Sequence, residues 1–155
     1  MRNKQIKMAA FGASVTEQSN GGGYVDFLNE KFTNGVERFA YGGDHISTSG
    51  VCNIDDVLTH SPTHCIIDWF STGYNIINQD TLNCLETITY KFSNAKCKLI
   101  FLFLPRIDHD ERIEFYEFVR DFLNKNNLYY IDLNENIKHS DKICRDSVHT
   151  TPFGA

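Results

Sequence analysis

The chain has 155 residues, of which 41% are hydrophobic, 23% charged and 13% aromatic, and its formal net charge is −5. This length suits one domain that buries its own core, and the longest apolar run, at 99–105, is far short of the ~20 residues that a membrane-spanning helix needs. Basic residues are dispersed rather than gathered on one helix, so no nucleic-acid partner is expected.

Apolar runs of strand length alternate along the sequence with amphipathic stretches of helical length. The strands are predicted, in chain order, at 5–11, 36–40, 64–70, 98–104 and 128–132. The helices are predicted between them, at 23–32, 51–60, 79–93 and 111–126. This alternation predicts an α/β fold with right-handed crossovers and a parallel sheet covered by helices on both faces. Near-continuous apolar runs at 65–70 and 99–104 indicate central strands.

The connections between these elements are where chemistry is expected. No Pro-, Ser- or Gly-rich linker, repeat or low-complexity tract interrupts the sequence, which predicts a single domain over residues 1–155. In open α/β sheets the ligand crevice lies beyond the carboxyl ends of the strands. The loops expected to converge there are 12–22, 41–50, 71–78, 105–110 and 141–152.

The first of these loops contains the sequence Phe11-Gly-Ala-Ser14-Val-Thr-Glu. A serine beside a glycine, just past a strand, can sit on a tight strand-to-helix turn with its hydroxyl exposed. Backbone N–H groups at the start of the following helix would then lie near that hydroxyl and favour a developing oxyanion. The alternative interpretation is that Ser14 simply caps a helix.

Two further loops carry small and polar residues. Adjacent glycines at Gly42 and Gly43 permit positive φ angles and let a backbone N–H approach a ligand closely. The segment Gly73-Tyr-Asn75 brings a side-chain amide that could donate a hydrogen bond into the same crevice. Taken alone, each motif is also explained by an ordinary turn.

A carboxylate and an imidazole follow near the C-terminus, in Asp146-Ser-Val-His149. At this spacing the carboxylate can hold one ring nitrogen and leave the other free to take a proton from a hydroxyl. A catalytic serine needs such a base because its hydroxyl is a poor nucleophile at pH 7. The alternative is a surface ion pair.

Together these four motifs resemble the four sequence blocks of the SGNH/GDSL hydrolase family. The matching positions are Gly12-Ala-Ser14, Gly43, Gly73-x-Asn75 and Asp146-x-x-His149, each past a predicted strand and in the order of the family. The resemblance implies a flavodoxin-like, three-layer α/β/α sandwich with a five-stranded parallel sheet. It also implies a triad of Ser14, Asp146 and His149, and an oxyanion hole made by the N–H groups of Ser14 and Gly43 and the side-chain amide of Asn75.

Three positions depart from the family pattern. Ala13 stands where an Asp usually precedes the serine, which points to a subgroup rather than to inactivity. Ile76 stands where the third block often continues with Asp. The adjacent Gly42 and Gly43 leave two candidates for the oxyanion glycine, of which Gly43, followed by Asp44, fits better.

The end of the sequence also differs from the family. Members normally continue past the catalytic histidine into a helix that packs on the sheet, whereas this chain ends six residues after His149. We therefore expect a domain without its C-terminal helix, or a fragment of a longer polypeptide. An apolar patch is expected where that helix would pack.

Three residues outside the motifs are candidates for binding substrate. Arg106 follows the fourth predicted strand and could hold a carboxylate or a sugar oxygen of the substrate, or could instead pair with Asp108 or Asp110. Tyr74 and Gln18 are predicted to line the pocket because of their positions in the loops.

Two aromatic residues near the motifs are interpreted as structural. Trp69 lies in a predicted buried strand and is expected in the core rather than as a platform for a sugar. His45, in the glycine loop, is expected to face solvent rather than the pocket.

The remaining composition argues against a cofactor and for a reducing compartment. No group of His and carboxylate residues has metal-ligand spacing, so neither a metal nor another cofactor is expected. The cysteines are odd in number, scattered and without a Cys-x-x-Cys pair, which predicts reduced, mostly buried thiols. The first motif begins too early to leave room for a secretory signal, so a cytoplasmic location is expected.

The function predicted from these residues is that of a serine ester hydrolase acting on small acyl esters through an acyl-enzyme on Ser14. The sequence Gly-Ala-Ser-Val-Thr, followed by Gly23-Tyr24, resembles SGNH domains of bacterial polysaccharide biosynthesis, which suggests O-acetyl groups of a carbohydrate as substrate. Two alternatives stay open: a carbohydrate O-acyltransferase using the same residues, and a non-catalytic binding module with a vestigial site. The expected partners are a small-molecule or carbohydrate ester and further domains of a longer chain.

Overall fold

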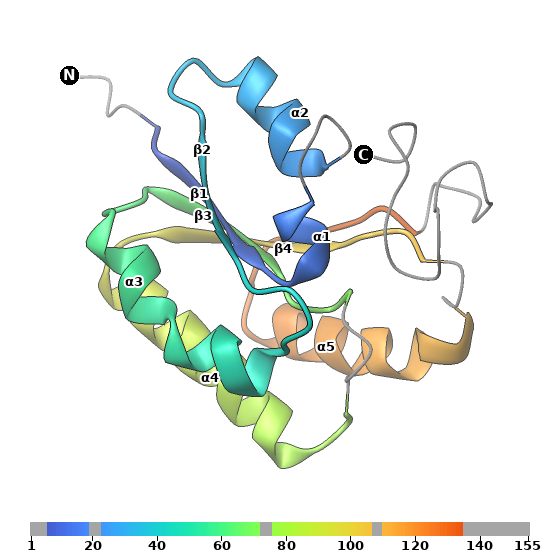
Figure 1. The fold of residues 1–155 in the computed structure, drawn as a ribbon. Helices are drawn as coiled ribbons and strands as arrows, with labels where there is room; N and C mark the ends of the chain where they lie inside the picture. Colours follow the sequence, from blue (N-terminus) through green and yellow to red (C-terminus); the bar gives the residue numbers. More distant parts are fainter. Residues whose placement is uncertain (1–5, 19–22, 72–75, 107–109, 135–155) are drawn as a thin grey trace.

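The computed structural model of the chain describes residues 6–18, 23–71, 76–106 and 110–134 (Figure 1). Its centre is a five-stranded sheet in which all pairings are parallel, in the order β2-β1-β3-β4-β5. The strands are β1 (Met8–Gly12), β2 (Val36–Ala40), β3 (His64–Asp68), β4 (Lys98–Phe103) and β5 (Tyr130–Asp132). The predicted α/β fold with a five-stranded parallel sheet is confirmed.

Helices cover both faces of this sheet. Three of them, α3 (Ile54–Thr59), α4 (Gln79–Asn94) and α5 (Ile113–Lys125), lie below the sheet in Figure 1. The other face is covered by α2 (Tyr24–Lys31) and by the short α1 (Ser14–Glu17). The predicted three-layer arrangement is therefore confirmed.

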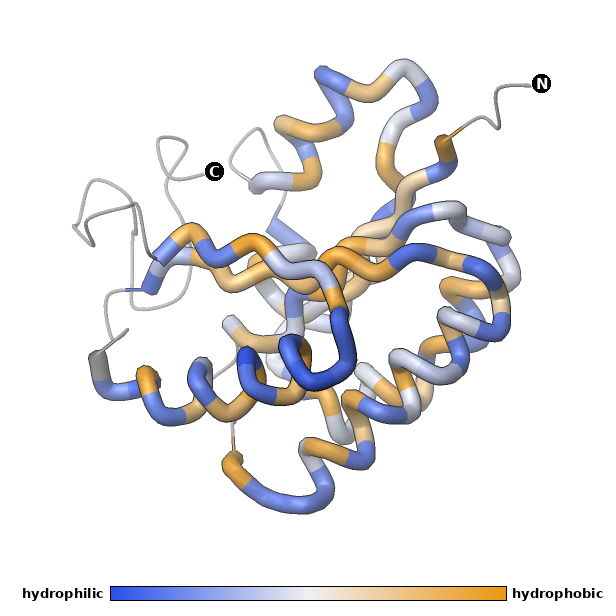
Figure 2. The backbone as a smooth tube through the Cα atoms, turned by 180° about the vertical axis from the view of Figure 1, so that it is seen from behind, coloured by the Kyte–Doolittle hydropathy of each residue, from blue (hydrophilic) through white to orange (hydrophobic). Residues whose placement is uncertain are grey.

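Both faces of the central strands are apolar. In β3, Cys65 and Ile67 pack with the helices α3, α4 and α5, whereas the intervening Ile66 packs in the smaller cluster under α2. A strand that alternates between two buried faces shows a continuous apolar run in its sequence, as observed at 65–67. Figure 2 shows the result as mostly hydrophobic strands at the centre, while the helices alternate between hydrophobic and hydrophilic positions.

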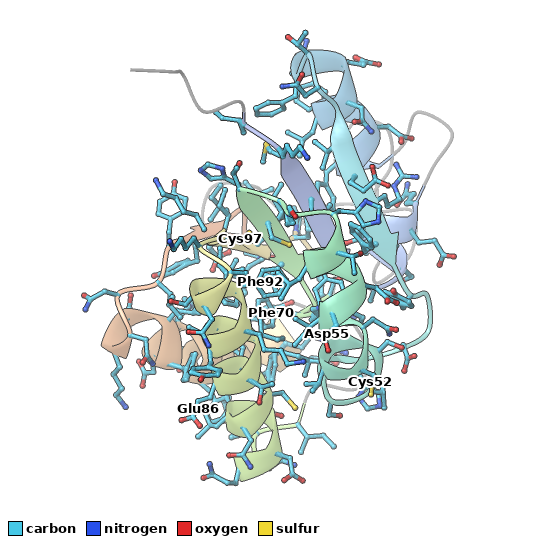
Figure 3. The ribbon with its side chains drawn as sticks, turned by 90° about the vertical axis from the view of Figure 1, so that its left-hand side faces the viewer. Cys52, Asp55, Phe70, Glu86, Phe92 and Cys97 are labelled. Atoms are coloured by element: carbon cyan, nitrogen blue, oxygen red, sulfur yellow. The ribbon has the colours of Figure 1, made fainter. Side chains whose placement is uncertain are left out.

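The larger part of the core lies between the sheet and α3–α5. Phe70, just past β3, and Phe92, from α4, lie inside this layer, whereas Glu86 on α4 points away from it (Figure 3). The indole of Trp69 is fully buried, and the Phe11 ring meets it edge-on at a centroid distance of 5.2 Å. The prediction that Trp69 belongs to the core is confirmed.

The predicted helices and strands are all present, with ends that differ from the prediction by three residues or fewer. The strand predicted at 36–40 has its predicted ends, while the one predicted at 64–70 ends at Asp68 because Trp69 and Phe70 fill the core beyond the sheet. Three short elements were not predicted: α1, the π-helix η1 (Ile46–Gly50) and the 3₁₀ turn η2 (Asp110–Arg112). A helix of three to five residues is too short to show a hydrophobic period.

The cysteines are reduced throughout the described part of the chain. Cys65 and Cys97 are buried, Cys84 is half-buried and Cys52 is exposed, and all four are free thiols. Cys144 lies outside the described residues. Among the helices described, none has the length and apolar character needed to cross a membrane.

Candidate active site

The register of the sheet places the carboxyl ends of β1, β2 and β3 level with one another. Gly12, the last residue of β1, pairs with Ala40 of β2 on one side and with Asp68 of β3 on the other. Two backbone hydrogen bonds continue this alignment past the strands: the Tyr41 N–H donates to the Gly12 carbonyl at 3.0 Å, and the Ala13 N–H donates to the Asp68 carbonyl at 3.1 Å. The loops that follow these three strands therefore begin side by side.

Ser14 is the first residue of α1, two positions past the end of β1, and its side chain is half-buried. The N-cap residue of this helix is Ala13, which has no side chain able to cap it, so the interpretation of Ser14 as the helix cap is wrong. The turn before the helix needs a glycine: a Cβ on Gly12 would lie 2.3 Å from both the Asp68 carbonyl oxygen and the Thr16 Oγ1. Close packing of β1 against β3 thus sets where Ser14 lies.

Gly43 lies in the neighbouring loop and adopts a left-handed φ of +78°, which glycine accepts most readily. A Cβ at Gly43 would meet nothing within 4 Å, whereas a Cβ at Gly42 would lie 2.0 Å from Glu17 Oε2. Of the two candidate glycines, Gly43 is the one whose backbone faces open space.

The loop after Gly43 is tied together by a carboxylate. Asp44 accepts hydrogen bonds from the hydroxyls of Ser49 and Thr48, and these bonds lower the pKa of Asp44. The Thr48 hydroxyl also accepts a hydrogen bond from the His45 N–H at 3.3 Å. These contacts join the residues next to Gly43 to the π-helix η1.

A cavity of about 240 Å³ opens between this loop and the residues that lead into α4. Its wall includes His45 and Ser47 from the loop that follows Gly43, Ile76 and Asn78 from the residues before α4, and Phe115 from α5. The predicted convergence of the loops at 41–50 and 71–78 is confirmed for these residues. His45 is half-buried and lines the cavity, which describes it better than the expected solvent-facing position.

Arg106 has a partner that sequence analysis did not anticipate. Its side chain is 1% exposed, and its Nη1 donates to the backbone carbonyl of Ser71, where the chain leaves the β3 end. Asp108 lies outside the described residues. The substrate-binding role of Arg106 stays a prediction, and the structure places its guanidinium in the protein interior.

Asp68 is a second buried charged residue that sequence analysis missed. It is 0% exposed and ends β3, and its carboxylate accepts hydrogen bonds from Ser71 Oγ at 2.9 Å and Thr16 Oγ1 at 3.2 Å. Burial raises the pKa of Asp68 to about 6, against the lowering effect of these hydrogen bonds and of nearby Arg106. The available signal was an acidic residue inside the apolar run Cys65-Ile-Ile-Asp-Trp-Phe, since burying an unpaired carboxylate is costly.

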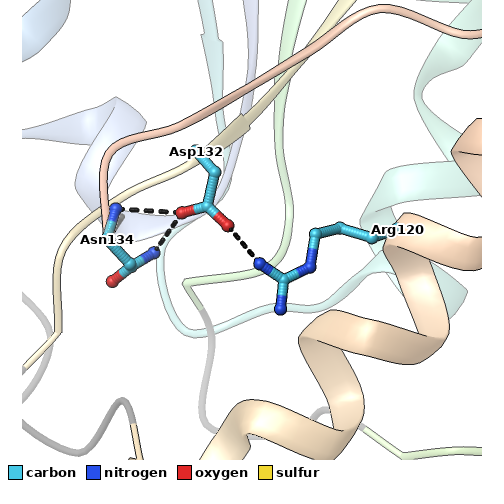
Figure 4. Close-up of polar contacts among 3 residues, drawn as sticks. All are labelled: Arg120, Asp132 and Asn134. Carbon is cyan, nitrogen blue, oxygen red and sulfur yellow. Dashed lines mark hydrogen bonds and ion pairs between the residues drawn. The ribbon is translucent and has the colours of Figure 1, made fainter. Parts of the chain in front are cut away.

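The last described strand also ends in a fixed carboxylate. Asp132, 8% exposed, accepts a hydrogen bond from Arg120 Nη1 in α5 at 2.8 Å (Figure 4). It accepts two more from Asn134, from the backbone N–H at 2.9 Å and the side-chain amide at 3.0 Å. This cluster holds the first turn of the chain past β5.

Four of the predicted site residues cannot be placed by this geometry. Asn75, Tyr74, Asp146 and His149 lie outside the described residues, so the triad and the amide of the oxyanion hole stay predictions. Gln18 is half-buried at the end of α1, with its backbone N–H donating to the Ser14 carbonyl at 3.0 Å. Within the described ranges, no three His, Cys, Asp or Glu side chains cluster as metal ligands would.

With its five parallel strands and two helical layers, the chain has the fold of the SGNH/GDSL hydrolases. A GDSL-like lipase from Bacteroides thetaiotaomicron VPI-5482 is similar in structure, with a TM-score of 0.74 and 18% sequence identity. The alignment covers 99% of this chain and 84% of the lipase. For the acetyl xylan esterase AlAXEase the TM-score is 0.72 at 21% identity, covering 96% of this chain and 93% of that one. For AlinE4, an SGNH-hydrolase family esterase, the TM-score is 0.72 at 18% identity, and the alignment covers 99% of this chain and 90% of AlinE4. No protein-family model matches the sequence, and no curated protein does.

Proposed function

We propose that the chain is an SGNH-type serine esterase that hydrolyses small acyl esters. The observation that carries this proposal is the level register of β1, β2 and β3, because it brings Ser14, Gly43 and the start of the segment with Asn75 to one edge of the sheet. The shared fold with esterases and a lipase supports the same reaction class. Ligands bind at this edge in open α/β sheets.

In the proposed reaction, Ser14 Oγ attacks the acyl carbon of the ester while His149 takes the hydroxyl proton. Asp146 orients the imidazole and stabilises its charged form. The tetrahedral intermediate collapses to an acyl-enzyme, and the alcohol leaves with the proton from His149. A water molecule then attacks the acyl-enzyme with His149 again as base, which releases the carboxylic acid and restores Ser14.

The developing oxyanion would be held by the N–H groups of Ser14 and Gly43 and by the side-chain amide of Asn75. The open backbone of Gly43 and the hydrogen bonds that tie Asp44 to η1 support this role, since an oxyanion hole works best when its donors are fixed in advance. Loss of one such donor typically lowers turnover by ~10²–10³-fold.

The proposed substrate is a carbohydrate O-acetyl group, and the proposed location is the cytoplasm. The acetyl xylan esterase among the similar structures supports an acetyl ester, and the resemblance of the first sequence block supports a carbohydrate. The cavity beside the Gly43 loop mixes apolar walls, such as Ile76 and Phe115, with polar ones, such as Asn78 and His45. Such a lining suits a sugar ring, which has apolar faces and polar edges.

The test is hydrolysis of p-nitrophenyl acetate by the wild-type protein and by Ser14→Ala, with labelling of Ser14 by a fluorophosphonate probe. We expect steady turnover and a covalent adduct on Ser14 for the wild type, and loss of both in the variant. Thr89→Val is the control, because it removes a hydroxyl that only donates to the Leu85 carbonyl within α4. A wild-type protein that neither turns over the ester nor reacts with the probe would reject the esterase proposal.

A further inference from the structure

A network of buried polar side chains lies directly beneath the turn that carries Ser14. Thr16, Asp68, Ser71 and Arg106 are each at most 2% exposed, and they are four of the six buried polar residues among those described. Tyr24 of α2, 7% exposed, joins the network through a 3.0 Å contact between its hydroxyl and Thr16 Oγ1. The other two of the six, Thr81 and Asp132, lie elsewhere, so most of the buried polar side chains among the described residues gather at this one place.

Asp68 holds the Ser14 turn through both its backbone and its side chain. Its carbonyl accepts from the N–H of Ala13, the residue before Ser14, at 3.1 Å. Its carboxylate accepts from Thr16, two residues after Ser14, at 3.2 Å. The nucleophile therefore lies between two hydrogen bonds to a single residue of the neighbouring strand.

The same carboxylate holds the start of the next loop. Asp68 Oδ1 accepts from Ser71 Oγ at 2.9 Å, and Arg106 donates to the Ser71 carbonyl. Ser71 is the last described residue before the segment 72–75, which contains Asn75. One carboxylate thus connects the loop of the nucleophile with the loop of the predicted oxyanion amide.

The hydrogen-bond directions require an acceptor at Asp68. Thr16 uses its single hydroxyl proton to donate to the carboxylate, so the Tyr24 hydroxyl donates to Thr16 in turn. Ser71 donates to the other carboxylate oxygen. An ionised carboxylate accepts both bonds with the help of its charge, whereas a protonated one is a weaker acceptor and carries an O–H that needs an acceptor of its own.

We propose that Asp68 is a positioning residue of this enzyme, whose ionised carboxylate fixes the turn of Ser14 against the start of the loop that carries Asn75. The proposal rests on the proposed esterase function, but the contacts that carry it do not depend on the identity of the ester. Among the described residues, the titratable or charged groups that act on Asp68 are Arg106, after β4, and Tyr24, in α2. Asp68 touches neither substrate nor the reacting atoms in this proposal.

The test compares Asp68→Asn, which keeps the shape and removes the charge, with the wild type. We expect a fall in kcat of at least tenfold with little change in KM, because ground-state binding is retained and alignment in the transition state is lost. In the wild type the acid limb of log kcat against pH should be steeper than a slope of 1 over the range in which Asp68 takes up its proton, because that step removes the ionised carboxylate. In Asp68→Asn the acid limb should have a slope near 1, from His149 alone.

A second readout needs no activity. The N–H groups of Glu17 and Gln18 form the hydrogen bonds of α1, to the carbonyls of Ala13 and Ser14. We expect their hydrogen exchange to be at least tenfold faster in Asp68→Asn. Asp26→Asn is the control, because Asp26 is likewise a carboxylate that joins two elements, but it pairs with Arg38 between α2 and β2. It should leave kcat, the slope and this exchange unchanged.

Thr16 provides a test that does not depend on how well Asp68→Asn folds. Thr16→Val removes the donor to Asp68 and should lower kcat, whereas Thr16→Ser keeps the hydroxyl and should restore it. Wild-type kcat together with the wild-type steepness of the acid limb in Asp68→Asn, or wild-type kcat in Thr16→Val, would overturn the positioning role even if exchange were faster. A wild-type protein without esterase activity would reject the proposed function, and the exchange of α1 would then decide alone whether Asp68 fixes the turn.

Discussion

The two loops that carry Ser14 and Gly43 lie side by side at the edge of the sheet but are held in different ways. Next to Gly43 the side-chain hydrogen bonds are local: Asp44 accepts from hydroxyls four and five residues further along the chain. The Ser14 turn is held from outside, by Asp68, 52 residues from Thr16 in sequence. A locally held loop depends mainly on its own residues, whereas a turn held from a neighbouring strand depends on the packing of the sheet.

The largest expected effect comes from disturbing the packing between β1 and β3. In Gly12→Ala the new Cβ would meet the Asp68 backbone carbonyl and the buried Thr16 hydroxyl at 2.3 Å, and the carbonyl cannot move without displacing β3. We expect a loss of about 3 kcal/mol in the free energy of unfolding, measured by urea denaturation. Gly42→Ala is the control, because its Cβ meets only the flexible end of Glu17, and an equal loss in both would show that the β3 contact does not matter.

The next effect is a pH dependence of stability that Asp68 brings. Its pKa is about 6 in the folded protein, raised by burial, against about 3.9 in an unfolded chain. Between these values the folded protein keeps a proton that the unfolded chain has lost, so the free energy of unfolding falls as pH rises. The free energy of unfolding falls by a total on the order of 3 kcal/mol, and the fall is complete once the pH is above the folded pKa of Asp68.

Urea denaturation from pH 4 to 7 measures this contribution. The free energy of unfolding of the wild type minus that of Asp68→Asn should decrease over this range, since the variant has no titrating carboxyl at position 68. Parallel curves for the two proteins would mean that Asp68 is not buried as a titrating group.

The smallest expected effect is in the locally held loop. Asp44→Ala removes the acceptor for Ser49 and Thr48 and should lower kcat by only about threefold, less than Asp68→Asn and less than the loss of an oxyanion donor itself, because the Gly43 N–H stays in the chain. The free energy of unfolding of the protein should change little in Asp44→Ala. A fall in kcat as large as that for Asp68→Asn would remove the proposed difference between the two loops.

Sequence patterns predicted what depends on neighbours along the chain. Hydrophobic runs and periods gave every strand and every helix of six or more residues, because these signals are local. The preference for Gly43 over Gly42 also came from its neighbour, Asp44. The short α1 was missed because four residues show no hydrophobic period and its conformation depends on packing: Val15 and Thr16 are both at most 1% exposed.

The Asp68 network could not be predicted, because it joins residues from three separate stretches of the chain. An acidic residue in an apolar run signals that a partner exists but not which one. Its partners, Thr16 and Ser71, are ordinary turn residues in sequence, and only the register of β1 on β3 brings Thr16 to it. The predicted triad cannot be judged in the same way, since Asp146 and His149 lie outside the described residues.

The single tryptophan of the chain gives this edge a built-in optical reporter. Trp69 follows Asp68 directly, its ring stacks with Tyr41 at a centroid distance of 6.3 Å, and a Cβ at Gly50 would lie 3.3 Å from it. The indole therefore directly follows the strand that holds the nucleophile turn and contacts the loop that contains Gly43. Its fluorescence should change when a ligand shifts either one, so binding can be followed without any label or chromogenic ester.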